Sequence, residues 1–445
     1  MSIKANFNKK IVLFTVDSIL FFLALFLALF IRRYDIFEFD YFLSHIPRFF
    51  ILYIYIILGL FIAGLYEIPQ FNLKIKKIKY ILYIISSYVV FGTSYFYLLP
   101  SEYSPKTVLI IQAGLLSFFI IAWRIYSKNL LKSNKKVKAL ILDKTEDSNE
   151  LRNELFKNDY GIEVAHHIEL SIFDMDKNPK QVLVDTIHRN KIDIIIADLK
   201  NEKLTTLLPH IYTLSGAGVK LYDLKNMYQY VFRKMPLSGV GYFWFYESVS
   251  LDTKVYEFVK RVTDIILCVP IFCVWFVLHP WTAYKIKQED DGEVYSIQER
   301  IGRYNKTIFI KKYRTMSFTD KGKWLENSEN KVTKIGKFLR KSRIDELPQI
   351  FSVWRGDLSF IGPRTDIVNL GEKLATEIPY YNLRYSVTPG LSGWAQTNMS
   401  FQPRTVQDTI ERLKYDLYYV KNRSIFLDIV IILRTIKTVL SREGS

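Results

Sequence analysis

Cysteine is scarce in this sequence, and acidic residues are outnumbered by basic ones. The 445 residues include two cysteines, Cys268 and Cys273, and both lie within one apolar stretch. That number and setting argue against a disulfide framework and against a zinc site. The 44 acidic residues are set against 61 lysines and arginines, which gives a formal net charge of +17. A charge of this size indicates an anionic partner, either nucleic acid or anionic lipid.

Long apolar runs decide between these two partners. The hydrophobic fraction is 49%, and four runs in the first third each approach the roughly 17 to 25 residues that cross a hydrocarbon core. The runs are Ile11–Ile31, Phe49–Tyr66, Tyr80–Leu99 and Thr107–Trp123. We therefore predict a bundle of four transmembrane helices over residues 1–130, with membrane lipids and no nucleic acid as partners.

Basic residues flank these runs on alternate sides. Lysines precede the first run, separate the second from the third and follow the fourth, which is the positive-inside pattern. Arg32, Arg33 and Arg48 between the first two runs are the weakest point of the pattern. We predict a multi-pass membrane protein in which both ends of the bundle are cytoplasmic.

Asp17 is an acidic residue within the first run. An intramembrane carboxylate is by default a candidate functional group. It lies only about two turns from the cytoplasmic edge, so we predict that water, Lys9 or Lys10 satisfies it and that it is not catalytic.

Residues 136–240 alternate short apolar runs with polar helical stretches. Val137–Leu142, Ile192–Ala197 and Gly218–Tyr222 are typical of buried parallel strands in a small α/β domain. A dinucleotide site would require a glycine-rich turn directly after the first strand, and the turn here, Asp143–Ser148, contains no glycine. We predict a structural or regulatory domain. The adjacent histidines at 166 and 167 have no ligand cluster beside them and are not predicted to bind metal.

Five short polar motifs lie close together in the last third. They are Gln298–Gly302, Lys312–Met316, Arg343–Gln349, Gly362–Arg364 and Pro389–Gln396. The motifs contain four basic residues that could bind phosphate: Arg300, Lys312, Arg314 and Arg364. They alternate with one acidic pair, Asp345 and Glu346, which can hold a hard metal ion or attack phosphorus. The motifs predict a phosphate-handling active site.

With these motifs in this order, Lys254–Leu440 resembles the bacterial sugar transferases, the polyprenyl-phosphate hexose-1-phosphate transferases. The larger members are monotopic phosphoglycosyl transferases that also carry a four-helix membrane bundle and a Rossmann-like module. The resemblance implies a membrane α bundle plus α/β protein: the bundle over 1–130, a degenerate Rossmann-like domain over 136–240, and a mostly helical catalytic domain over 254–445. It also implies the inner membrane of a bacterium as location.

The resemblance further implies an activity and site roles. A sugar-1-phosphate would pass from a UDP-sugar to undecaprenyl phosphate, releasing UMP and starting exopolysaccharide, capsule or O-antigen synthesis. Asp345 would attack the β-phosphate to form a covalent phosphosugar intermediate, and Asp345 with Glu346 would bind Mg²⁺. The phosphate and nucleotide ligands would be Arg300, Lys312, Arg314, Arg364 and Gln349. One departure is Thr365, where the family usually has a second proline.

A further apolar run, Ile265–Leu278, is 14 residues long with Pro270 near its middle. It is short for a straight crossing, and proline disrupts the helical hydrogen bonds at its centre. We predict a re-entrant helix over residues 262–283 with its break at Pro270, which keeps the catalytic domain on the cytoplasmic face. The alternative is a buried core helix.

The tail Tyr415–Leu440 has apolar residues at helical spacing opposite Asp428 and other polar residues. It is predicted to lie in the membrane interface, with a packed core helix as the alternative. For the whole chain, the alternatives to an enzyme are a non-catalytic scaffold or regulator of glycan assembly and, third, a transporter. A homodimer is left open.

Overall fold

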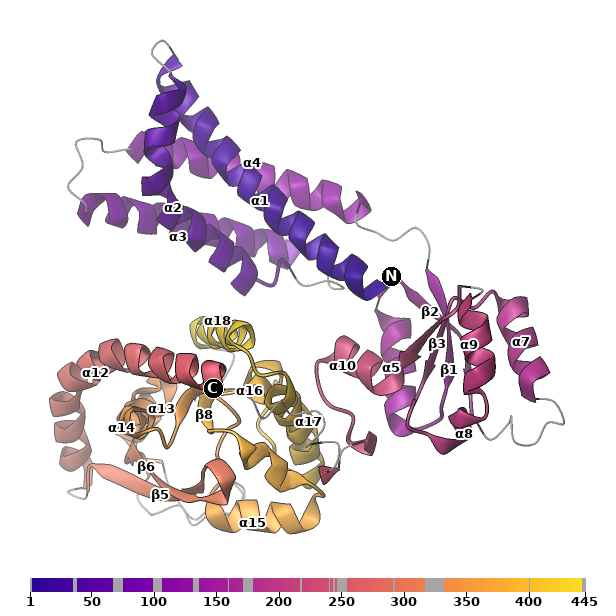
Figure 1. Cartoon of the computed structure of the whole chain (residues 1–445). Helices are drawn as coiled ribbons and strands as arrows, with labels where there is room; N and C mark the ends of the chain where they lie inside the picture. The colour runs from indigo at the N-terminus through magenta and orange to yellow at the C-terminus, as the bar shows by residue number, and fades with distance from the viewer. Residues whose placement is uncertain are drawn as a thin grey trace. The chain divides into compact units, whose positions relative to one another are not determined.

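The structure is a computed structural model. It describes residues 2–34, 38–66, 75–98, 106–130, 136–158, 160–170, 179–216, 218–239, 241–242, 245, 254–290, 293–316, 332–399 and 401–441. The chain forms two compact units, Met1–Leu224 and Lys225–Ser445. The protein is mostly helical, with apolar helices near the N-terminus and a small parallel sheet, as predicted in these coarse terms (Figure 1). The finer division into three domains stays a prediction.

The first unit begins with four long apolar helices. These are α1 (Ser2–Arg32), α2 (Phe39–Ile62), α3 (Ile75–Leu98) and α4 (Lys106–Leu130). One core cluster joins them and includes Phe21, Leu52 and Leu116. Large apolar side chains also point outward, such as Val90 and Phe118. Each of these helices is long and apolar enough to cross a membrane. A helix that is apolar on all sides is suited to lipid and not to water.

A buried ion pair joins the first and last of these helices. The sequence predicts water, Lys9 or Lys10 as partners of Asp17, but in the structure Asp17 is 1% exposed and pairs with Arg124. Its Oδ2 accepts a hydrogen bond from Arg124 Nη2 at 2.5 Å and from the Tyr66 hydroxyl at 2.7 Å. The expectation was wrong because a carboxylate in an apolar bundle needs a charged partner on a neighbouring helix.

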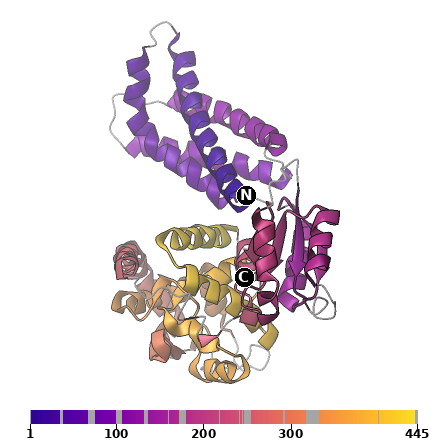
Figure 2. The same ribbon diagram turned by 45° about the vertical axis from the view of Figure 1, so that its right-hand side comes forward.

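A four-stranded parallel sheet follows in the same unit. Its elements are β1 (Val137–Leu142), α5 (Glu146–Lys157), β2 (Ile162–Ile168), α7 (Pro179–Asn190), β3 (Ile194–Ala197), α8 (Glu202–Thr205), α9 (Leu208–Gly216) and β4 (Lys220–Asp223). The strand order is β2-β1-β3-β4, and all neighbouring pairs are parallel. Figures 1 and 2 show α5 on one face of the sheet and α7 and α9 on the other.

The turn after β1 is occupied by the chain's own polar groups. The Thr145 hydroxyl accepts from the Ser148 amide at 3.4 Å and donates to Asp143 Oδ2 at 2.7 Å. Thr145 thus caps α5, at the position where a dinucleotide-binding turn would present free amides to a pyrophosphate. The sequence did not predict β2 as a strand. That strand contains His166 and His167, and Ser148 Oγ lies 3.1 Å from His167 Nε2.

The second unit is built from many short elements. They are α10 (Leu224–Phe232) at its start, η2 (Leu237–Gly239), α12 (Lys254–Asp290), β5 (Tyr295–Ile301), η3 (Arg303–Asn305), β6 (Thr307–Tyr313), α13 (Lys334–Ser342), η5 (Ile344–Gln349), α14 (Ile350–Arg355), β7 (Ser359–Ile361), α15 (Val368–Glu377), η6 (Tyr381–Ser386), β8 (Gly390–Ser392), α16 (Trp394–Asn398), α17 (Val406–Asn422) and α18 (Ile425–Ser441). Strands β5 and β6 pair antiparallel, and β7 and β8 pair parallel.

Helix α12 is longer than the predicted 262–283 and continues through Pro270. Figure 1 shows that it bends sharply, so that its two halves run in different directions. Its outward side chains are large and apolar, as at Phe258, Ile266 and Phe276. The helix also includes the polar residues before the apolar run, such as Arg261 and Asp264, whose side chains contact the folded unit.

The tail is two helices, α17 and α18, and not the single helix expected over Tyr415–Leu440. The expectation that Asp428 lies on an exposed polar face is also wrong. Asp428 is 8% exposed and accepts hydrogen bonds from Tyr256 and Lys260 of α12. Phe426 points outward instead. An acidic residue with partners on a neighbouring helix can therefore lie on the packed face.

Candidate active site

The β5–β6 hairpin brings two of the predicted cations to one face. In its register Arg300 is opposite Ile308, and Lys312 is opposite Ser296. Because side chains alternate along a strand, Ile308, Ile310 and Lys312 share a face, and their cross-strand partners share it with them. Ile308 and Ile310 are buried, so this face of the hairpin turns into the unit and takes Arg300 and Lys312 with it.

The acidic pair lies in the short 3-10 helix η5. Arg343 precedes it with a φ of 58°, which turns the chain out of α13. Oε1 of Glu346 lies 3.5 Å from Lys312 Nζ, 3.7 Å from Arg364 Nη2 and 3.9 Å from Arg343 Nη1. Three of the five motifs therefore meet at one carboxylate.

The glycines of the last two motifs let two backbone segments touch. The Gly362 amide donates to Ser392 O at 2.9 Å, and the Gly390 amide donates to Pro363 O at 3.0 Å. A Cβ on Gly390 would lie 2.1 Å from the Gly362 nitrogen, so a side chain there would force the segments apart. Their contact fixes the loop that carries Arg364.

These residues line a pocket that is open to solvent. Its lining is Arg300, Ile310, Lys312, Glu346, Gln349, Leu358, Arg364, Thr365, Gly390 and Leu391. The pocket thus holds three cations and one carboxylate, a charge balance that suits phosphate. Among the described residues, Arg314 and Asp345 do not line it. The Arg314 amide donates to Val294 O at 3.0 Å.

The two carboxyl groups of the acidic pair experience opposite surroundings. Burial would raise the pKa of Glu346, but Arg364, Lys312 and Arg343 together hold it below its usual value. Burial and the nearby Glu346 charge raise the pKa of Asp345. Burial lowers the pKa of Lys312 to about 8. Paired groups whose pKa values are pushed apart are typical of active sites.

Asp345 retains an uncommitted oxygen. Its Oδ1 is buried and has no hydrogen-bond partner within the described part of the chain. Such an atom is available either to attack phosphorus or to bind a cation. Mg²⁺ takes oxygen ligands and often only one or two carboxylates, with waters and substrate phosphates completing its shell. Asp345 and Glu346 fit that donor set.

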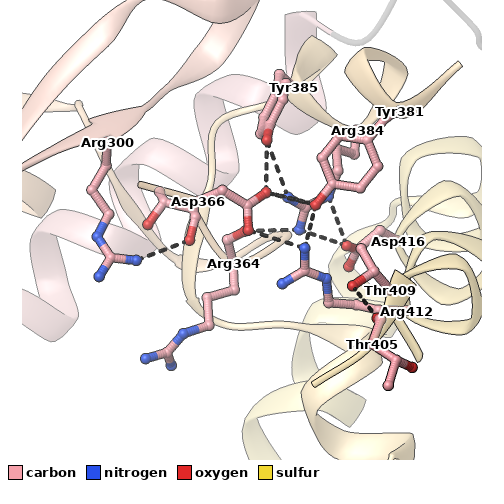
Figure 3. Close-up of polar contacts among 11 residues, drawn as sticks. Arg300, Arg364, Asp366, Tyr381, Arg384, Tyr385, Thr405, Thr409, Arg412 and Asp416 are labelled. Carbon is pink, nitrogen blue, oxygen red and sulfur yellow. Dashed lines mark hydrogen bonds and ion pairs between the residues drawn. The ribbon is translucent and has the colours of Figure 1, made fainter. Parts of the chain in front are cut away.

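One group of charged residues beside the pocket was missed by the sequence reasoning. It consists of Asp366, Arg384, Arg412 and Asp416, which Figure 3 shows close together beside Arg300 and Arg364. The only sequence signal is that Asp366 follows the Gly362–Arg364 motif by two residues. The others are brought to it by η6 and α17.

Comparison with known proteins identifies relatives of the segment that holds the pocket. A model of the bacterial sugar transferase family matches residues 255–442. The chain is 32% identical over 262 residues to a UDP-N-acetylgalactosamine-undecaprenyl-phosphate N-acetylgalactosaminephosphotransferase of Aeromonas hydrophila, which covers 57% of this chain and 60% of that protein.

Two glucose transferases give similar matches. The identity is 30% over 234 residues with a UDP-glucose:undecaprenyl-phosphate glucose-1-phosphate transferase of Escherichia coli (strain K12), over 52% of this chain and 47% of that protein. The identity is 32% over 190 residues with a transferase of the same description from Caulobacter vibrioides, and the match covers 42% of this chain and 71% of that protein. The chain spans less than two thirds of the first two relatives. Together with the pocket, these matches show that the chain belongs to the bacterial sugar transferase family.

Proposed function

We propose that the protein transfers a sugar-1-phosphate from a UDP-sugar to undecaprenyl phosphate and releases UMP. The observation that carries the proposal is that Arg300, Lys312, Arg364 and Glu346 line one pocket, with Asp345 next to Glu346 in η5. The names of three relatives, each a UDP-sugar to undecaprenyl-phosphate transferase, agree with it. The product would start an exopolysaccharide, capsule or O-antigen.

The chemistry divides into two displacements at one phosphorus. In the first, an Asp345 carboxylate oxygen attacks the β-phosphorus of the donor, and the bond to the bridging oxygen breaks. UMP leaves with that electron pair, and the sugar phosphate stays on Asp345 as an acyl phosphate. In the second, an oxygen of undecaprenyl phosphate attacks the same phosphorus and the Asp345 carboxylate is restored. Each step concentrates negative charge that the fixed cations offset.

The carboxylate pair would also hold Mg²⁺, as the orphaned Asp345 Oδ1 supports. When bound, the ion would offset phosphate charge and act as a Lewis acid. Lys312 and Arg364, which contact Glu346, would bind donor phosphates. Arg300 lines the same pocket.

The predicted re-entrant form of α12 is part of the proposal. Near its start, Glu257 Oε1 accepts a hydrogen bond from Arg423 Nη1 at 2.7 Å, and just before the apolar run Asp264 Oδ1 accepts one from Ser359 Oγ at 3.0 Å. Near its end, Glu289 carboxylate oxygens accept from the Lys334 and Ile335 amides at 2.6 and 3.0 Å. Both ends of α12 therefore contact the same folded unit, whereas a straight span would separate its ends by roughly 30 Å of hydrocarbon. This supports a helix that enters and leaves on one face.

The remaining assignments complete the proposal. The four apolar helices of residues 1–130 would span the inner membrane with both ends cytoplasmic. The domain over 136–240 would be structural or regulatory. The catalytic domain would then lie on the cytoplasmic face, where UDP-sugars are made.

Turnover tests the proposed function. We expect the purified full-length protein, given undecaprenyl phosphate and Mg²⁺, to release UMP and form a lipid-linked sugar with at least one member of a panel of UDP-sugars. The matched reaction without undecaprenyl phosphate controls for hydrolysis of the donor. Folded protein that forms no lipid-linked sugar with any member of the panel would contradict the proposal.

A further inference from the structure

A buried charged cluster lies behind the pocket and contributes none of its lining. Its members are Asp366, Tyr381, Arg384, Tyr385, Arg412 and Asp416. Arg384 and Asp416 are each 1% exposed. The two arginines balance the two aspartates, so the cluster has no surplus charge with which to bind an anion. Figure 3 shows the side chain of Arg364 extending away from it.

Arg384 links this cluster to the pocket. Its Nε and Nη2 donate to Asp416 Oδ2 on α17 at 3.0 and 2.7 Å, and its Nη1 donates to Asp366 Oδ2. Nη2 also donates to the backbone carbonyl of Arg364 at 2.8 Å. A guanidinium presents its donors in a rigid planar fork, so these contacts fix the position of that carbonyl relative to α17.

The next two carbonyls of the same loop accept hydrogen bonds from β5. Thr365 O accepts from Arg300 Nη1 at 3.1 Å, and Asp366 O accepts from the Ile301 amide at 2.9 Å. The three consecutive carbonyls of residues 364–366 are thus all engaged. Any shift of this loop would move Arg364 and Arg300 together.

The aspartate at the centre stays charged. Burial opposes its ionisation, but Arg384 and Arg412 overcome this and hold the pKa of Asp366 below its usual range. The hydroxyls of Tyr381 and Tyr385 donate to Asp366 Oδ2 at 2.8 and 2.6 Å. The carboxylate therefore has partners from both η6 and α17, and Asp366 stays ionised.

We propose that Arg384 is a positioning residue for the anion site. It fixes the backbone of residues 364–366, and through this backbone it sets where Arg364 and Arg300 meet the phosphates. The inference rests on the proposed function to the extent that the pocket must bind phosphate.

Binding of inorganic pyrophosphate to the full-length protein tests this role. Arg384→Lys keeps the positive charge and loses the fork, so we expect the dissociation constant, measured by calorimetry, to rise about tenfold. Asp416→Asn leaves the Arg384–Asp366 contact in place and should give a smaller rise. This second variant keeps the test decisive if Arg384→Lys does not fold.

The matched control is Glu411→Gln, also on α17. It removes the negative charge that pairs with the buried Lys234 at 2.8 Å, and the partners given for Glu411 among the described residues are Lys234 and Lys414, outside residues 364–366. We expect a lower melting temperature and an unchanged dissociation constant. A purely structural role for Arg384 would lower the fraction of folded protein, and hence the binding stoichiometry, but not the affinity of folded molecules.

The outcomes are distinguishable. If Arg384→Lys melts earlier but binds pyrophosphate as the unaltered protein does, the positioning role is wrong and the proposed function stands. If the unaltered protein does not bind pyrophosphate, the anion site itself fails, and the inference fails with it.

Discussion

Asp345 and Glu346 are neighbours in the chain, yet they lie in different surroundings. Glu346 is surrounded by three cations, which keep its carboxylate ionised. Asp345 is desolvated beside that charge and has a buried oxygen without a partner within the described residues. A carboxylate of raised pKa is a stronger nucleophile once it is ionised. In the proposed mechanism, this difference suits Asp345 to the role of attacking group and Glu346 to that of the residue that orders the cations.

The charge of Lys312 predicts how donor binding depends on pH. Burial lowers the pKa of this lysine to about 8, so it carries its charge below that pH and loses it above. We expect kcat/KM for the UDP-sugar to fall as the pH rises through about 8, because the neutral amine no longer attracts phosphate. The measurement is a pH profile of kcat/KM between pH 6 and 10.

Two variants test whether Lys312 causes this pH dependence of kcat/KM. Lys312→Arg should move the fall to higher pH, since a guanidinium stays charged throughout the range. Lys311→Arg is the control, because the Lys311 ammonium lies over the Tyr295 ring, 4.4 Å from its centroid, and adjacent residues on β6 face opposite ways. A fall near pH 8 that persists unchanged in Lys312→Arg would assign it to another group.

Single residues show what the motifs could and could not predict. The motifs named Arg300, Lys312, Glu346 and Arg364, and the structure brings these together in one pocket. Each belongs to a short segment whose composition signals its chemistry. Arg384 has no such signal, because its partners lie 18 and 32 residues away and only the packing of η6 against α17 brings them close.

Among the elements, α12 combines a polar inner face with an apolar outer one. Arg261 donates to the carbonyl of Val353 at 2.6 Å, at the end of α14, and Asp264 binds β7. These polar residues interrupt the apolar pattern, which is why the sequence predicts a shorter helix than the structure has. In an amphipathic helix, such polar residues indicate the side that packs on the catalytic unit.

The topology of α12 can be measured with single cysteines. In a background without Cys268 and Cys273, we expect Lys254→Cys and Tyr284→Cys both to be shielded from an impermeant thiol reagent added outside intact cells. Both should react once the membrane is opened, because a re-entrant helix returns to the face it entered from.

A helix that crosses the membrane would give a different labelling pattern. If Tyr284→Cys were labelled from outside while Lys254→Cys was not, α12 would be a true fifth span. A surface position on the catalytic unit, such as Lys373→Cys, reports in the same experiment which face that unit occupies.

For the whole molecule, composition was more informative than local propensity. The excess of positive charge and the long apolar runs predicted a membrane protein with an anionic partner, and five described helices have the length and composition to cross a membrane. Buried polar contacts were the part that could not be predicted. The Asp17–Arg124 pair and the place of Asp428 depend on neighbours that are distant in the sequence.

Release of UMP by donor alone tests the central claim most directly. With the UDP-sugar that supports turnover, labelled in its β-phosphate, and without undecaprenyl phosphate, we predict one burst of about one UMP per active protein and a covalent label on the protein. Asp345→Asn should give neither, and Asp357→Asn, which alters a carboxylate paired with Arg355 at 3.0 Å on the surface, should behave as the unaltered protein does. Turnover without any burst or label, or a full burst from Asp345→Asn, would contradict the account.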